Sequence, residues 1–300
     1  MRKSRPWFAI GLVSGLLAWS CDSGPESGLV IPDSPDGAVQ VVLSGLAAHR
    51  PEVMWRALPP SYQDDISGLV RSFADHVEPA LHQRAVVVAR KAVVVLQAKK
   101  ELILTSDTIR AATAADPAAV DAAWEAAVHA ADIVLSSELA DLEALRELDV
   151  ESFLATTGRA LMDRAAEIPA IGGEGEGFAD RLESLGEAEV ELVAADGDRA
   201  TVRIRLPDLA PFEIDMVRVE GRWLPVELAS RWPEAVESAA ARIEAMAGDQ
   251  AARVELVAFV ALGVAESFLD QLAGVTTAEE LDRLVGAFLG NLLGQPLGVL

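Results

Sequence analysis

The chain has 300 residues, of which 51% are hydrophobic, and a net charge of −22 from 47 acidic and 25 basic residues. This apolar content can form a sizeable core, which excludes disorder for most of the chain. The acidic surface and the absence of a dense Lys/Arg cluster after residue 5 exclude a nucleic-acid binder. Cys21 is the only cysteine, so the chain has neither an intrachain disulfide nor a thiolate metal cluster.

Residues 1–21 have the parts of an export signal. Three positive charges precede Trp7, and an uncharged run follows that is too short for an ordinary membrane-spanning helix. With Ala18, Trp19 and Ser20 directly before Cys21, the segment resembles a bacterial lipoprotein signal peptide. The resemblance implies a lipid on Cys21, such as palmitate, and an exported body anchored to a cell-envelope membrane, facing the periplasm or the outside. An ordinary secretory signal with a coincidental cysteine is the alternative.

Residues 22–34 are rich in Ser, Gly, Pro and Asp and are expected to form a flexible tether. Helical patterns then fill residues 35–168. Pro35 and Pro51 begin two short helices, and Pro117 begins a later one. The valine-rich stretch that ends near Leu104 has the composition of a buried strand as well, but interleaved Ala, Lys, Arg and Gln favour a helix.

Residues 169–187, which contain GGEGEG, are expected to be a joint, and after it the apolar period changes from 3.6 to 2. Four antiparallel strands are predicted at about 188–226, within a segment 188–247 that ends in a helix. A three-residue turn at 196–198 would pair Glu191 with Arg203 and Glu189 with Arg205. The apolar alternation changes phase near Met216, which predicts a bulge there.

Residues 248–300 are expected to form apolar C-terminal helices, and 284–300 contain no charge. A second membrane anchor is one interpretation of this segment. Packing on the body or on a second copy is favoured, because Asn291, Gln295 and Pro296 weaken a spanning helix.

Together these elements predict an α+β fold that is predominantly helical, with a four-stranded antiparallel meander packed against helices. The opening helices from Ala38 to Ser61 and the strand containing Gly221-Arg222-Trp223 resemble the nuclear-transport-factor-like, cystatin-like α+β family found in small bacterial lipoproteins. The resemblance implies a cone in which a curved sheet wraps a helix, here with a long helical insertion. A helical bundle that carries a meander is the alternative.

No sequence motif identifies a catalytic, cofactor or metal site, so we predict none of these. The histidines, His49, His76, His82 and His129, lack metal-ligand spacing. Related isomerases place a tyrosine and an acid in the cone, and Tyr62, the only tyrosine, has Asp64 and Asp65 nearby. A structural hydroxyl is favoured for Tyr62, and a hairpin turn rather than a calcium loop is favoured for Asp196-Gly197-Asp198.

These observations predict a membrane-anchored envelope lipoprotein with a non-catalytic binding or structural role. Its expected partners are the membrane, through the lipid on Cys21, and an envelope protein or a small apolar ligand. No cofactor and no nucleic acid are expected. The alternatives are a small-molecule isomerase or hydrolase that uses Tyr62 and a nearby acid, and a homo-oligomeric scaffold built on residues 250–300.

Overall fold

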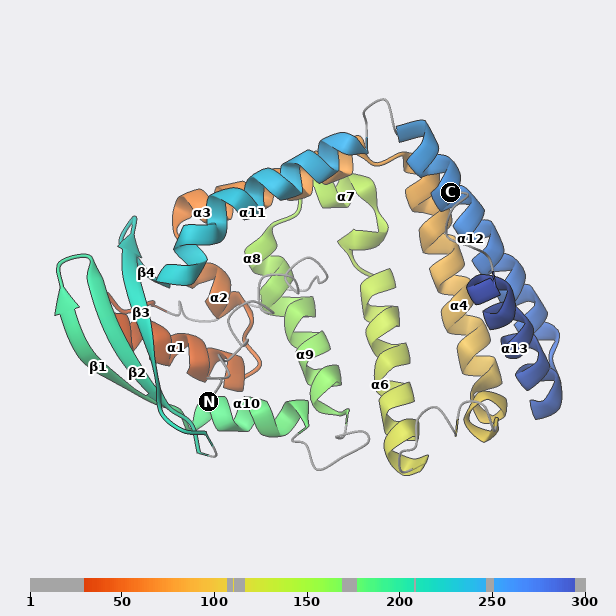
Figure 1. The fold of residues 1–300 in the computed structure, drawn as a ribbon, viewed down its shortest axis with the longest axis horizontal. Helices are drawn as coiled ribbons and strands as arrows, with labels where there is room; N and C mark the ends of the chain where they lie inside the picture. Colours follow the sequence, from red (N-terminus) through yellow and green to blue (C-terminus); the bar gives the residue numbers. More distant parts are fainter. Residues whose placement is uncertain are drawn as a thin grey trace. The chain divides into compact units, whose positions relative to one another are not determined.

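The structure is a computed structural model that describes residues 30–106, 110, 117–168, 177–207, 209–246 and 251–294. It is mostly helical with one four-stranded antiparallel sheet, which confirms the predicted α+β class (Figure 1). The chain forms two compact units, each assembled from three separate stretches. Unit 1 comprises Met1–Asp75, Ser137–Asp163 and Asp180–Ile243; unit 2 comprises His76–Ser136, Arg164–Ala179 and Glu244–Leu300.

The sheet of unit 1 is a meander in the order β1-β2-β3-β4. Its strands are β1 (Glu189–Asp196), β2 (Arg199–Arg205), β3 (Phe212–Val219) and β4 (Arg222–Pro225). Ala200, Val202 and Ile204 alternate with polar residues along β2, and all three are buried. The period-2 pattern therefore identified the strands correctly. Pro225, which has no N–H to donate to a neighbouring strand, ends the edge strand β4.

The first hairpin has the predicted charge pairs but a different turn. Glu189 pairs with Arg205 and Glu191 with Arg203, as predicted. Asp196, however, pairs directly with Arg199, so the turn has two residues and not three. A bulge between Leu192 and Ala194 absorbs the extra residue. The prediction of a three-residue turn was therefore wrong. The same charge pairs form when the extra residue lies in a bulge inside β1 and not in the turn.

The predicted bulge near Met216 is also wrong. The register from Arg199 to Ile204 against β3 is unbroken, and so is that of β3 against β4. Both faces of the sheet are instead covered at this end. Met216 packs in the main core, whereas Val219 packs with Tyr62 and Trp232 in a second cluster. A strand covered on both faces loses its alternation without any irregularity in the backbone.

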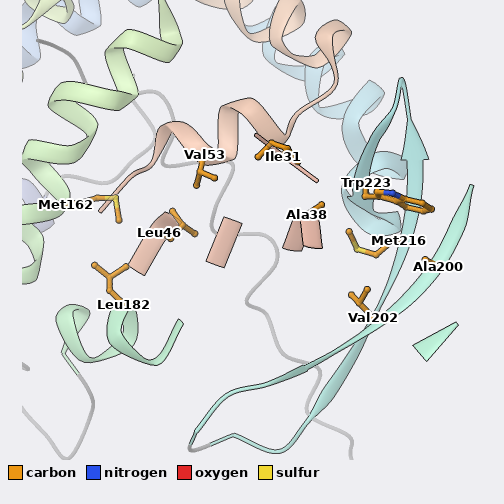
Figure 2. Close-up of a cluster of buried hydrophobic side chains, with 10 residues drawn as sticks. All are labelled: Ile31, Ala38, Leu46, Val53, Met162, Leu182, Ala200, Val202, Met216 and Trp223. Atoms are coloured by element: carbon orange, nitrogen blue, oxygen red, sulfur yellow. The ribbon is translucent and has the colours of Figure 1, made fainter. Parts of the chain in front are cut away.

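The main core of unit 1 lies between the sheet and helices α1 (Pro35–Ala47) and α2 (Glu52–Ala57) (Figure 2). Ser34 caps α1 by accepting from the Gly37 N–H at 3.2 Å. The Cα of Gly45 faces Val53 so closely that a Cβ at position 45 would lie 2.7 Å from the valine. The core contains ten buried residues: Ile31, Ala38, Leu46, Val53, Met162, Leu182, Ala200, Val202, Met216 and Trp223.

The last residues of the predicted tether belong to the folded body. Ile31 is buried in the main core, and the Trp223 Nε1–H donates to the Asp33 carbonyl at 2.8 Å. Arg218 forms an ion pair with the Asp33 carboxylate. Residues 22–29 lie outside the described part of the chain. The prediction of a tether was therefore wrong for residues 31–33, because one isoleucine and two sheet contacts suffice to fix them.

Helices α3 (Pro60–His76) and α11 (Val226–Ala245) contribute Tyr62 and Trp232 to the second cluster. The other short helical segments of unit 1 follow Ser136: η2 (Glu138–Ala140), α7 (Leu142–Arg146), α8 (Val150–Phe153), the π-helical turn η3 (Leu154–Gly158), α9 (Arg159–Ala166) and α10 (Phe178–Gly186). The last residues of α9 belong to unit 2. Helix α10 occupies most of the second half of the predicted joint, because Leu182 provides a buried apolar contact. The glycine-rich residues 172–176 lie outside the described residues.

Unit 2 is helical where the structure describes it. Helix α4 (Pro79–Thr105) contacts α6 (Pro117–Leu135), α12 (Ala251–Gly274) and α13 (Ala278–Gly294). The valine-rich stretch thus forms a helix and not a strand, as predicted. Its Val88 and Val95 pack with Leu269, Leu272 and Leu281 in a separate core. Lys91 forms ion pairs with Glu266 and Asp270 across the α4–α12 contact.

Candidate functional site

Cys21, for which we predict lipidation, lies outside the described residues, so its lipidation stays a prediction. The described residues contain no group of three or more His, Cys, Asp or Glu side chains placed to hold a metal ion. Asp196 and Asp198 lie at the β1–β2 hairpin, where Gly197 takes a φ of 59°. The positive φ favours glycine at this turn.

Tyr62 lies in a packed aromatic cluster. Its ring stacks on Trp232 with a centroid separation of 4.1 Å and an interplanar angle of 7°. The nearby Asp65 carboxylate accepts from the Trp232 Nε1–H at 2.8 Å. Burial first, and then the charges of Asp65 and Glu220, raise the pKa of the Tyr62 phenol. These contacts make Tyr62 a packing residue held as the neutral phenol, and they do not favour its use as an acid or base near neutral pH.

A second polar cluster surrounds Glu52, whose side chain is only 2% exposed. Glu52 Oε1 accepts from Arg50 Nε at 2.9 Å and lies 3.7 Å from Arg159 Nη2. Glu52 Oε2 and Arg159 Nε are buried without a partner among the described residues. Arg159 follows the η3 turn, where a Cβ on Gly158 would lie 2.9 Å from Pro51 Cγ. The two arginines compensate the buried carboxylate, so this cluster joins the α1–α2 turn to α9.

His49 lies beside this cluster and ends the first helix. It takes a φ of 55°, the left-handed conformation common at helix C-termini. His49 Nδ1 lies 2.5 Å from Asp163 Oδ1. His76 ends α3, while His82 and His129 lie on α4 and α6 of unit 2. The structure therefore gives His49 a contact with Asp163 at the end of the helix.

Strand β1 forms an exposed outer edge of the sheet. Strand β1 is exposed along most of its length, and Leu192 and Val193 are each 41% exposed. Glu189, Glu191 and the bulge at Val193 interrupt this edge. Charges and bulges on an edge strand oppose pairing with another strand. We therefore regard β1 as a protected edge and not as a docking site.

Among the described residues, four of the exposed large apolar side chains lie on α12 of unit 2. Leu256, Val257, Val260 and Val264 are between 40% and 64% exposed. They recur at helical spacing, so they form one stripe along the side of α12 opposite the residues that pack against α4. We call Arg253, Leu256, Val260, Val264 and Ser267 the outer stripe of α12; all five are exposed. Sequence reasoning identified this segment as apolar but could not tell which of its faces is covered.

Among the described helices, α12 contains a segment, Glu255–Gly274, that is long and apolar enough to cross a membrane. Only 11% of its most apolar 18-residue stretch is buried. Two of its charged residues, Glu266 and Asp270, form ion pairs with Lys91 of α4. Leu269 and Leu272 on the same helix are buried in the core of unit 2. These contacts describe a helix packed on one side and exposed on the other.

Comparison with known proteins gives no further guide to this surface. No protein-family model matches the chain, and no curated protein or solved structure shows significant similarity to it.

Proposed function

We propose that the chain is a membrane-anchored envelope lipoprotein with a non-catalytic binding role, in which the outer stripe of α12 contacts a protein partner. The observation that carries the binding role is the exposure of the stripe: Leu256 is 64% and Val260 55% exposed. Contiguous exposed apolar residues on one face are typical of interaction surfaces. The signal-like residues 1–21 and Cys21 support the membrane anchor.

The contacts of the polar clusters do not favour catalysis. The Tyr62 ring is stacked on Trp232, and the Glu52 carboxylate is shared by two arginines. Both clusters join helices within unit 1. The alternative of an isomerase or hydrolase requires Tyr62 to face a substrate beside a free carboxylate, and the Asp65 carboxylate already accepts from Trp232.

The anchor is tested by measuring the intact mass of the protein extracted from membranes of a producing bacterium. We expect a diacylglyceryl addition on Cys21 and loss of membrane fractionation in Cys21→Ser. A free thiol on Cys21 in the extracted protein would leave only a secreted protein and would contradict the anchor.

The binding role is tested by the accessibility of one cysteine on the stripe. A Val260→Cys chain in native membranes should react more slowly with a water-soluble maleimide than the same chain after purification and dilution in detergent. Val94→Cys on α4 is the control, because Val94 is 63% exposed and lies outside the stripe. Equal reaction rates of Val260→Cys in both states would contradict the binding role.

A further inference from the structure

We infer that the partner of the outer stripe is a second copy of this chain, bound through an antiparallel, twofold-symmetric pairing of α12 with α12. This inference deepens the proposed function and rests on its binding role, because it names the partner. The geometry of the pairing does not depend on the lipid at Cys21.

The first observation is the spacing of the five residues of the outer stripe. Arg253, Leu256, Val260, Val264 and Ser267 are separated by three, four, four and three residues, which is the same sequence of spacings in either direction. A twofold axis at Val260 therefore places Leu256 of each copy opposite Val264 of the other. It also places Val260 opposite Val260 of the second copy. A twofold interface requires a surface that matches itself in this way.

The second observation is the charge at the two ends of the stripe. Arg253 is the charged residue at its N-terminal end. Asp270, which pairs with Lys91 of α4 but keeps a side chain 65% exposed, lies just beyond its C-terminal end. Antiparallel pairing brings Arg253 of one copy toward Asp270 of the other. Parallel pairing would instead bring Arg253 against Arg253, and it would also align the two helix dipoles unfavourably.

The third observation concerns the chemistry of the central part. Between Arg253 and Ser267 the stripe itself presents only aliphatic side chains, three of them at least 48% exposed. The remaining charges of this part of α12, Glu255 and Glu266, are only partly exposed, and Glu266 is paired with α4. The centre of the stripe therefore presents no charge that would oppose its contact with the same side chains of a second copy.

The test uses the full-length chain in native membranes, with Val260→Cys and Val264→Cys as two matched variants. Antiparallel pairing places the two thiols of Val260→Cys opposite each other. It separates those of Val264→Cys by eight residues along the axis, or about 12 Å, well beyond the ~4 Å between the Cβ atoms of a disulfide. Oxidation should therefore give a reducible band of twice the mass of the unlinked chain with Val260→Cys and not with Val264→Cys.

A second arrangement tests the register. Differently tagged chains carrying Leu256→Cys and Val264→Cys should cross-link to each other when they are produced together. The wild-type chain controls for Cys21, and Val94→Cys controls for random collisions of exposed thiols. Cross-linking of Val264→Cys as strong as that of Val260→Cys would indicate parallel pairing and would overturn the inference, and so would equal cross-linking of Val94→Cys.

The remaining outcomes separate this inference from the proposed function. If Val260→Cys forms the dimer while Cys21 carries no lipid, the membrane anchor fails and the inference stands. If Val260→Cys cross-links only to a different protein, the inference fails and the binding role stands. If Val260→Cys forms no cross-link but is shielded from maleimide by lipid, both the inference and the protein-binding role fail.

Discussion

Replacing Arg50 by methionine is expected to destabilise unit 1 more than replacing Glu52 by glutamine. Glu52 is 2% exposed, so its carboxylate cannot be hydrated when its partner at 2.9 Å is removed. Arg159, 3.7 Å away, would remain as the weaker counter-charge. Breaking a buried ion pair costs about 3–5 kcal/mol, and the remaining arginine places Arg50→Met near the lower end, at about 3 kcal/mol.

Removing the negative charge is expected to cost less. The side chains of Arg50 and Arg159 are 21% and 37% exposed, so both guanidinium groups can reach water. Glutamine keeps the size of Glu52 and one hydrogen-bond acceptor. We therefore expect about 1–2 kcal/mol for Glu52→Gln, in the range of a lost charge-assisted hydrogen bond. The double variant should be more stable than Arg50→Met alone, because neutral glutamine no longer leaves a buried charge.

Urea unfolding of the full-length variants, followed by tryptophan fluorescence, measures these differences, since Trp55, Trp223 and Trp232 all belong to unit 1. Arg205→Met is the control: Arg205 forms exposed ion pairs on the sheet and should cost about 0–1 kcal/mol. A cost for Glu52→Gln equal to or larger than that for Arg50→Met would refute the reasoning, because it would show that the exposed arginines depend on the carboxylate.

Three further predictions concern stability and titration. Gly45→Ala should destabilise unit 1 by about 1–3 kcal/mol, because the new Cβ would lie 2.7 Å from the core residue Val53. Gly68→Ala on α3 should stabilise the chain by about 0.5–1 kcal/mol, because a Cβ there meets no other atom within 4 Å. Denaturant unfolding of both variants measures the two free-energy changes. Tyr62 is the only tyrosine, so tyrosinate absorbance follows its titration directly; we expect a pKa above 10.0, and a midpoint at or below that value would contradict its buried stacking. The Ser61 N–H and hydroxyl lower the pKa of Glu220 below 4.5, so its stabilising effect is present above pH 4.5 and is lost as the pH falls through the lowered pKa. Glu220→Gln should therefore make the unfolding free energy less sensitive to acid, and an unchanged acid profile would contradict this.

The sequence was informative wherever one face of an element decides its structure. The alternation along 199–205 predicted β2 and its charge pairs with β1, and Pro35, Pro51 and Pro117 located the starts of α1, α2 and α6. The sequence was misleading where two different backbone structures produce the same pattern of apolar residues. A bulge inside β1 has the same effect on register as a longer turn, and a second cluster around Trp232 removes the alternation of β3 as a bulge would.

The division into units could not be predicted from local patterns. Each unit joins three stretches that are distant in sequence, and the Asp33 carbonyl accepts from Trp223 of β4, 190 residues later. The polar clusters are hidden for the same reason. Glu52 and Arg159 are ordinary helix residues in the sequence, and their pairing depends on how the α1–α2 turn packs on η3.

The energy available from the outer stripe limits what kind of partner it can hold. Full burial of a valine or leucine is worth about 1.5–3 kcal/mol, and the three aliphatic side chains of the outer stripe are already about half buried. Each therefore contributes roughly 1 kcal/mol, or roughly 6 kcal/mol for two copies. Association costs about 4–15 kcal/mol, so the pairing of α12 alone gives at most a weak dimer in dilute solution. Confinement of both copies to one membrane raises their effective concentration and reduces that cost. Loss of the lipid on Cys21 should therefore weaken the Val260→Cys cross-link without changing its register, which connects the predicted anchor to the proposed interface.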